Sequence, residues 1–223
     1  MARTIDPTKR TTLGLLLFAG AVAGCSTTGA RAPGARPDEG IDYRLAETPQ
    51  PTRAAPGRIE VVELFWYGCP HCNAMEPGLV AWARALPPDV AFRKVHLGLG
   101  PRWVPHQRLF CALERVGRDA SLDARVFRAI HVDGRALGTR DEAAEVVAAA
   151  GVDRGAFVDA WESDAVREAM READAFAAAL GVQGVPTLVV DGRLVTSPGM
   201  TGSYHATLSV VDALLAKVRA RTA

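Results

Sequence analysis

Cysteine is scarce in this chain, and neither sign of charge dominates it. The 223 residues include four cysteines, too few for a disulfide-stapled scaffold, and the formal net charge is only +1. Nothing in that balance suggests a nucleic-acid partner. The apolar run at residues 11–24 is too short to span a bilayer comfortably. The length still suffices for one or two domains with a real core, and the apolar fraction of 48% is that of an ordinary globular protein.

Two of the four cysteines, Cys69 and Cys72, are separated by two residues. A strand-like run over 59–65 precedes them, and a helix-like run over 73–86 follows them. Cys69 is therefore expected at the amino end of a helix, where the helix dipole and the unpaired backbone N–H groups favour a negative group. A thiolate is such a group, so we expect the pKa of Cys69 to fall and its reactivity at neutral pH to rise. Cys72 lies one turn further along and can close a short disulfide with Cys69.

The two residues between the cysteines also favour a helix start with a stabilised thiolate. Pro70 fits the first turn of a helix, where no N–H group is needed, and His71 can stabilise the thiolate through a positive charge or a hydrogen bond. The alternatives are half of a zinc site and an inert structural disulfide. A structural zinc site needs four ligands, but Cys25 and Cys111 form no second pair with this spacing. The strand before the motif and the helix after it favour a thioredoxin-like redox dithiol, with no metal.

The first 24 residues have the pattern of an export signal, with basic residues before the apolar run. Two endings compete. The sequence AVA at residues 21–23 has the form of an ordinary cleavage site, whereas VAGC at residues 22–25 resembles the lipobox of bacterial lipoproteins, in which Cys25 is lipidated. The scarcity of cysteine favours the lipobox, and with it a membrane anchor at Cys25. Both endings export the protein to an oxidising compartment, where disulfide chemistry is possible.

Residues 25–57 are rich in Pro, Gly, Thr and Arg and lack apolar periodicity. We therefore expect a flexible tether there, in which residues 41–43 could form a short ordered patch that packs on the domain. The regular apolar pattern begins at residue 58, where we place the start of the folded domain.

The elements from residue 58 onward follow a clear order. The strand over 59–65 is nearly all apolar, as a central strand covered on both faces should be, and a second strand over 90–96 completes a βαβ unit. Residues 102–180 carry helical signals alone. The helices expected there are 104–116, 122–131 with Ser121 as N-cap, one opened by the capping box at 139–142, 154–162 with Asp153 as N-cap, and 164–180 with Ser163 as N-cap.

Strand signals return after residue 180. Residues 186–190 and 193–196, joined by Asp191-Gly192, have the pattern of a β-hairpin. A final helix is expected over 203–220, with its apolar residues on one face. The sequence thus predicts an α/β protein: a thioredoxin fold (βαβ…ββα) over 58–101 and 181–220, interrupted by an all-helical insertion over 102–180.

With this dithiol and this order of elements, residues 58–220 resemble the DsbA family of periplasmic thiol:disulfide oxidoreductases. The dithiol motif, the buried acid six residues before it, the lysine and histidine of the second strand, and the Val–cis-Pro pair of the family all have counterparts here. These counterparts are Cys69, Pro70, His71, Cys72, Glu63, Lys94, His96, Val185 and Pro186. The chain departs from the family at residues 66–68, where Trp-Tyr-Gly stands in place of the common aromatic pair, and in its extra thiol, Cys111.

The resemblance implies that the Cys69–Cys72 disulfide is donated to reduced, unfolded exported proteins, with no soluble cofactor. It also implies a membrane reoxidase of the DsbB type as partner, a periplasmic location, and a monomer that binds no nucleic acid. In this fold a cis-proline at Pro186 faces the dithiol and exposes the backbone of Val185 to an extended substrate. Glu63 would accept a proton near Cys72, and Lys94 would be its counter-charge.

Each of these roles has a plainer alternative. Glu63 could face solvent at a sheet edge, and Val185-Pro186 could simply begin a strand. Cys111 is expected to be a buried small apolar residue rather than a third redox thiol. For the whole protein, the alternatives are a disulfide reductase or isomerase of the same fold, and a substrate-binding, chaperone-like protein whose dithiol is incidental.

Overall fold

A five-stranded sheet has β2 (Ile59–Phe65) near its centre, because side chains on both faces of this strand are covered. β2 pairs in parallel with β3 (Val90–His96) and antiparallel with β4 (Thr187–Val190). β5 (Leu194–Thr196) and the two-residue β1 (Arg44–Leu45) complete the order β1-β5-β4-β2-β3. These details come from a computed structural model, which describes residues 36–222.

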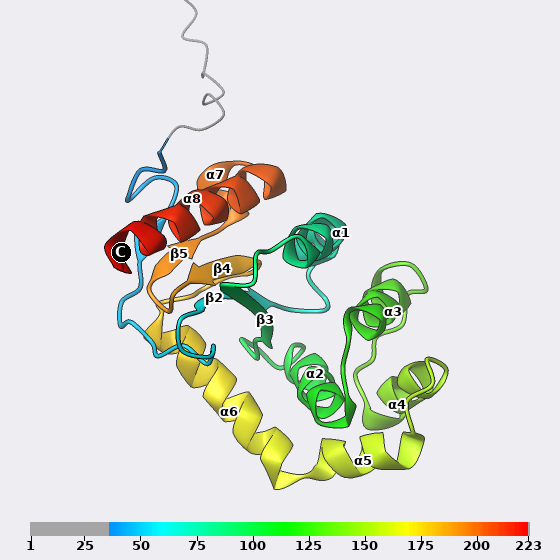
Figure 1. Cartoon of the computed structure of the whole chain (residues 1–223). Helices are drawn as coiled ribbons and strands as arrows, with labels where there is room; N and C mark the ends of the chain where they lie inside the picture. The colour runs from blue at the N-terminus through cyan, green and yellow to red at the C-terminus, as the bar shows by residue number, and fades with distance from the viewer. Residues whose placement is uncertain (1–35, 223) are drawn as a thin grey trace, which may run out of the picture. The chain divides into compact units, whose positions relative to one another are not determined.

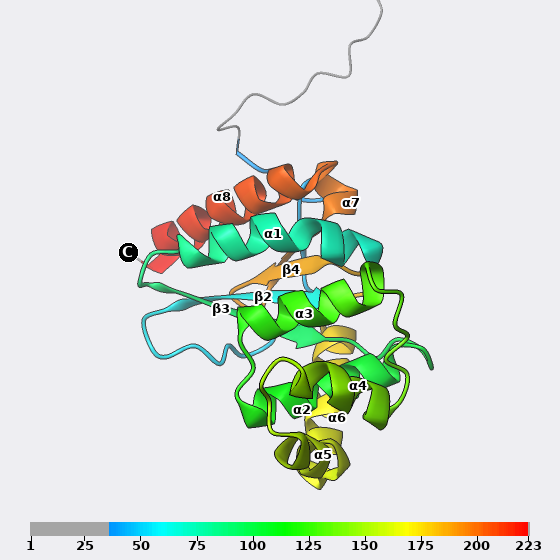
Figure 2. The ribbon, with the colours of Figure 1, turned by 90° about the vertical axis from the view of Figure 1, so that its right-hand side faces the viewer.

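Helices cover both faces of the sheet (Figures 1 and 2). α1 (Pro70–Arg84), the short α7 (Pro198–Thr201) and α8 (Tyr204–Thr222) lie on one face, and α6 (Asp164–Ala179) lies on the other. Within residues 36–222, no helix is both long and apolar enough to cross a bilayer.

Alternate side chains of β2 enter two different cores, as the period of a strand requires. Val61 packs in a core that also contains Leu79 of α1 and Leu215 of α8. Val62 and Leu64 pack in a second core on the face covered by α6. All three β2 side chains are fully buried, so burial of each contributes about 1.5–3 kcal/mol.

The helical insertion leaves the sheet after β3. Its first four helices are α2 (Val104–Val116), α3 (Ala120–His131), α4 (Arg140–Ala148) and α5 (Arg154–Glu162). They enclose a third core, and the end of β2 and the dithiol segment also belong to it. The dithiol therefore lies where the insertion and the sheet meet.

The predicted fold, a thioredoxin order interrupted by helices, is confirmed, and so are most of the predicted helix starts. Thr139 forms the predicted capping box, and Asp153 and Ser163 cap α5 and α6. Ser121 is wrong as the cap of α3. The carboxylate of Asp119 accepts hydrogen bonds from two backbone N–H groups of the first turn, at 2.8 and 2.9 Å, so this helix begins at Ala120.

The flexible tether predicted for residues 25–57 is wrong for residues 36–57. Arg44 and Leu45 pair with β5. The ordered patch expected at residues 41–43 is confirmed at Tyr43, which is 1% exposed in the core beside α8. The Arg44 guanidinium also donates hydrogen bonds to the carbonyls of Leu180 and Gly181. A pairing of two residues is too short to leave an apolar period in the sequence. The predicted export signal, residues 25–35 and Cys25 lie outside the described residues.

Candidate active site

The dithiol occupies the start of α1. Cys69 is the N-cap residue, with extended backbone angles, and Pro70 is the first helical residue, so the helix begins three residues before the predicted start at residue 73. The Cys69 sulfur accepts a hydrogen bond from the Cys72 backbone N–H at 3.5 Å. Both cysteines are free thiols here, so the structure represents the dithiol form. Cys69 retains 6% exposure and Cys72 none, so Cys69 is the more accessible sulfur.

The pKa values of the two cysteines are shifted in opposite directions. The side-chain hydrogen bond from Cys72, the backbone N–H groups of Cys72 and His71, and the charge of His71 lower the pKa of Cys69 to about 6, although burial opposes them. Burial, the hydrogen bond to Cys69 and the charge of Glu63 raise the pKa of Cys72 far above its ordinary value. At neutral pH Cys69 is therefore a thiolate and Cys72 a thiol.

The Val185–Pro186 peptide bond is cis, and its loop faces the dithiol. The Cys69 sulfur lies 3.6 Å from the Val185 carbonyl oxygen. A groove of about 740 Å³ runs beside this loop, with Met200 and His71 among its lining residues. An extended chain in this groove would have the Val185 backbone and the Cys69 sulfur within reach together.

Glu63 is fully buried, so the alternative of a solvent-facing edge position is excluded. It pairs in register with Lys94 on β3, and the Lys94 ammonium lies 3.5 Å from its carboxylate. Lys94 is closer to Glu76 of α1, to which it donates hydrogen bonds at 2.5 and 2.6 Å. The counter-charge predicted for Glu63 is thus shared with a second buried carboxylate.

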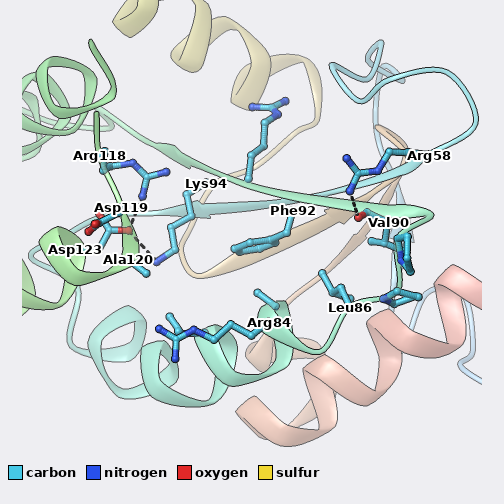
Figure 3. A pocket seen from close by; sticks show the side chains of 15 residues that line it. Arg58, Arg84, Leu86, Val90, Phe92, Lys94, Arg118, Asp119, Ala120 and Asp123 are labelled. Carbon is cyan, nitrogen blue, oxygen red and sulfur yellow. Dashed lines mark hydrogen bonds and ion pairs between the residues drawn. The ribbon is translucent and has the colours of Figure 1, made fainter. Parts of the chain in front are cut away.

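A third carboxylate joins this cluster from the insertion. Asp123 of α3 lies 3.5 Å from the Lys94 ammonium and 2.5 Å from the guanidinium of Arg118. Figure 3 shows Lys94, Arg118 and Asp123 directed toward one another at one end of a cleft of about 440 Å³. The buried cluster therefore contains three carboxylates and two cations.

The Glu63 carboxyl has neither oxygen in a hydrogen bond within the described part of the chain. Its burial raises its pKa from 4.5 to about 7, because the attraction of Lys94 only partly offsets burial and the charges of Glu76 and Asp123 raise it further. A carboxyl that titrates near pH 7 can both accept and release a proton under physiological conditions.

Tyr67, two residues before Cys69, is fixed at three points. Its backbone N–H donates to Nε2 of His96 at 3.1 Å, its carbonyl accepts from Nε2 of His131 at 2.8 Å, and its hydroxyl donates to Asp123 at 2.5 Å. Burial lowers the pKa of His96 well below its ordinary range, which keeps this ring neutral and able to accept. Two of the three partners come from α3, so the insertion helps to position the loop that carries the dithiol.

The sequence did not identify Glu76, Arg118, Asp123 or Tyr204 as site residues. One signal pointed to Glu76, which follows the buried Cys72 by four positions and so shares its helix face. The other three meet the site through contacts far apart in the sequence. Cys111 is buried, and burial raises its pKa to about 12, which agrees with the predicted inert thiol. No group of three or more His, Cys, Asp or Glu residues between 36 and 222 is arranged to hold a metal ion.

Comparisons with known proteins agree with this geometry. Residues 60–204 match the family of the DSBA-like thioredoxin domain. The thiol:disulfide interchange protein DsbA of Azotobacter vinelandii is 45% identical over 166 residues, which cover 74% of this chain and 78% of that protein. Its namesake from Pseudomonas aeruginosa PAO1 is 41% identical, over 81% of this chain and 85% of that protein.

Solved structures give the same result. The crystal structure of Pseudomonas aeruginosa DsbA superimposes with a TM-score of 0.79 at 40% identity, and covers 83% of this chain and 96% of that one. The oxidoreductase DsbA from Xylella fastidiosa has a TM-score of 0.78 at 32% identity, over 83% of this chain and 100% of that one.

Proposed function

Because this chain belongs to the DSBA-like thioredoxin family and is a thiol:disulfide oxidoreductase, we propose that Cys69 and Cys72 are its redox pair and that it donates their disulfide to reduced, unfolded exported proteins. The observation that carries this proposal is the opposite shift of the two sulfurs, with the pKa of Cys69 lowered and that of Cys72 raised. Stabilising the Cys69 thiolate stabilises the reduced form, which makes the disulfide a stronger oxidant.

The reaction begins when a substrate thiolate attacks the Cys69 sulfur of the disulfide. The Cys69–Cys72 bond breaks, a mixed disulfide forms, and Cys72 leaves with the electron pair. Since the raised pKa of Cys72 favours the thiol, the leaving sulfur takes up a proton, for which Glu63 is the proposed carrier. Lys94 is the auxiliary charge that keeps the affinity of Glu63 for this proton moderate.

A second substrate thiolate then attacks the substrate sulfur of the mixed disulfide. Cys69 leaves as the stabilised thiolate, the substrate gains a disulfide, and the enzyme is left with two reduced cysteines. His71 stabilises the Cys69 thiolate, Pro70 begins the helix that does the same, and Val185 with Pro186 holds the extended substrate. No soluble cofactor enters these steps.

The proposed setting follows from the sequence and the family. We place the protein in the periplasm, anchored through a lipid on Cys25, as a monomer that a DsbB-type membrane protein reoxidises. The export pattern of residues 1–24 supports this setting. We also propose the division into a thioredoxin-like part, residues 58–101 and 181–220, and an insertion, residues 102–180. Residues 44–45 add a strand to the sheet of the thioredoxin-like part.

The two thiols are distinguished by trapping. In cells that express Cys72→Ser, the Cys69 thiolate can attack a disulfide of an exported protein and expel one of its two sulfurs as a thiolate. The resulting mixed disulfides should accumulate, because no Cys72 thiol remains to attack the Cys69 sulfur and release the substrate. Cys69→Ser should accumulate none. Equal trapping by both variants would overturn the assignment. The oxidised protein should also form one disulfide per enzyme molecule in a reduced two-cysteine peptide, and failure to oxidise the peptide would instead favour a reductase, an isomerase or a chaperone-like protein.

A further inference from the structure

The exposed side chain of His71 is held by a residue from the far end of the chain. Its Nδ1 lies 3.0 Å from the hydroxyl oxygen of Tyr204, the first residue of α8 and 133 positions away in the sequence. This contact joins the dithiol to a helix that contributes no other residue to the site described above.

Tyr204 is itself fixed by the corner between α7 and α8. Gly202 adopts a left-handed conformation, with φ of 83°, that ends α7. The Ser203 hydroxyl accepts a hydrogen bond from a backbone N–H group in the first turn of α8. The hydroxyls of Thr201 and Thr207 are hydrogen-bonded across the corner at 2.7 Å. The Tyr204 ring is half-buried against the core that α1 and α8 share. The corner and this packing therefore fix the ring that carries the hydroxyl independently of the contact with His71.

A phenol hydroxyl is suited to hold a histidine ring because it can both donate and accept a hydrogen bond. It can donate to Nδ1 of a neutral imidazole, and it can accept from Nδ1–H of the imidazolium. The contact thus persists in both charge states of His71 and fixes the ring without opposing its charge. Without this partner, an exposed side chain would sample several rotamers, and the average position of its charge would move away from the sulfur.

We propose that Tyr204 is a positioning residue of the redox reaction, which holds the His71 imidazole beside the dithiol so that its positive charge acts on the Cys69 sulfur. This proposal rests on the role assigned above to His71. The charge of His71 is one of the groups that lower the pKa of Cys69. A fixed imidazole therefore favours the reduced enzyme and strengthens it as an oxidant.

The test compares Tyr204→Phe with the unchanged full chain in the reduced state. Every chain in this test also carries Cys25→Ser, so that only Cys69, Cys72 and Cys111 remain. Thiolate absorbance measured against pH then reports Cys69, because the pKa values of Cys72 and Cys111 lie well above neutrality. The loss of the hydroxyl should raise the pKa of Cys69 by about 0.5, and His71→Ala should raise it by about 1. The equilibrium with glutathione should shift about threefold toward oxidised Tyr204→Phe enzyme.

Two comparisons separate this role from a structural one. Tyr204→Phe in a His71→Ala background should add no further shift, because its effect passes through the imidazole. Tyr43→Phe is the matched control, since the Tyr43 hydroxyl contacts Lys217 and Glu39 instead of the dithiol, and it should leave the pKa of Cys69 unchanged.

Equal shifts with and without His71, or no shift in Tyr204→Phe, would overturn the inference, and so would an unchanged pKa of Cys69 in His71→Ala. Peptide oxidation by the unchanged protein is measured separately. A failure of that assay would count against the proposed function, while the pKa comparison would still decide the role of Tyr204.

Discussion

Replacement of Glu63 by glutamine should stabilise the protein, and only above acidic pH. Glu63 is fully buried, its carboxyl oxygens make no hydrogen bond within residues 36–222, and it faces one ammonium group shared with two other carboxylates. Ionising a carboxyl in such a place costs free energy that one shared cation does not fully return. Glutamine keeps the size and shape of the side chain and removes its charge.

The magnitude follows from the pKa of Glu63, which burial raises from 4.5 to about 7. Between these pH values the folded protein holds a proton that the unfolded chain releases, so the wild type loses stability as the pH rises through this window. The full difference corresponds to about 3 kcal/mol. Glu63→Gln has no such titration. It should match the wild type to within about 1 kcal/mol at pH 4 and exceed it by about 2–3 kcal/mol at pH 8.

The assay is urea unfolding of the reduced protein at several pH values between 4 and 8. Glu60→Gln is a matched control on the same strand, because the buried Glu60 carboxylate accepts hydrogen bonds from the Arg93 guanidinium and the Arg53 backbone N–H. That variant should lose about 1–3 kcal/mol at pH 7. If Glu63→Gln and the wild type differed by the same amount at pH 4 and pH 8, Glu63 would not be the buried titrating group described here.

Three further outcomes are expected. Glu63→Gln should slow thiol exchange at Cys72, measured by alkylation after rapid quenching; marked destabilisation with unchanged exchange would make Glu63 a structural partner alone. His71→Ala should lower the reduction potential measured against glutathione, whereas an unchanged potential would assign the tuning to the helix terminus. Fatty-acid labelling of the expressed precursor should give a labelled band that Cys25→Ala abolishes, and a soluble, unlabelled protein beginning at Gly24 would instead support cleavage after the AVA sequence.

Local patterns in the sequence were enough for the main elements of the fold. Strand β2 is apolar on both faces, and capping residues such as Thr139 mark helix starts because they bond to backbone groups only three positions away. β1 was not predicted because a strand of two residues shows no period, although the adjacent Tyr43 packs on the domain as expected. Elements defined by a long-range pairing leave little local trace.

The site residues likewise divide into those that local sequence patterns predict and those that depend on long-range contacts. Cys69, Pro70 and Cys72 are placed by one helix start, so their spacing, with the strand before and the helix after, predicted the thiolate. Glu63 and Lys94 meet because β2 and β3 are neighbours in register, which follows once the βαβ unit is known. The contacts of Asp123 and Tyr204 depend on how α3 and α8 pack against the site, and no residue near either one in the sequence indicates this packing.

The buried charge cluster explains why the Glu63 carboxyl can serve the Cys72 thiol, which keeps its proton at neutral pH. When the enzyme is reoxidised, two sulfurs must lose their protons, but Cys69 has already lost its own near pH 7 because its pKa is about 6. Cys72 keeps its proton and is fully buried, so an acceptor within the protein is needed. Glu63 suits this role because the opposed effects of burial and Lys94 leave its pKa at about 7. If Lys94 were absent, burial would keep Glu63 protonated at neutral pH, and a protonated carboxyl cannot accept the proton of Cys72. If Glu63 were instead exposed to solvent, its pKa would return toward 4.5, and it would be a poor base at neutral pH.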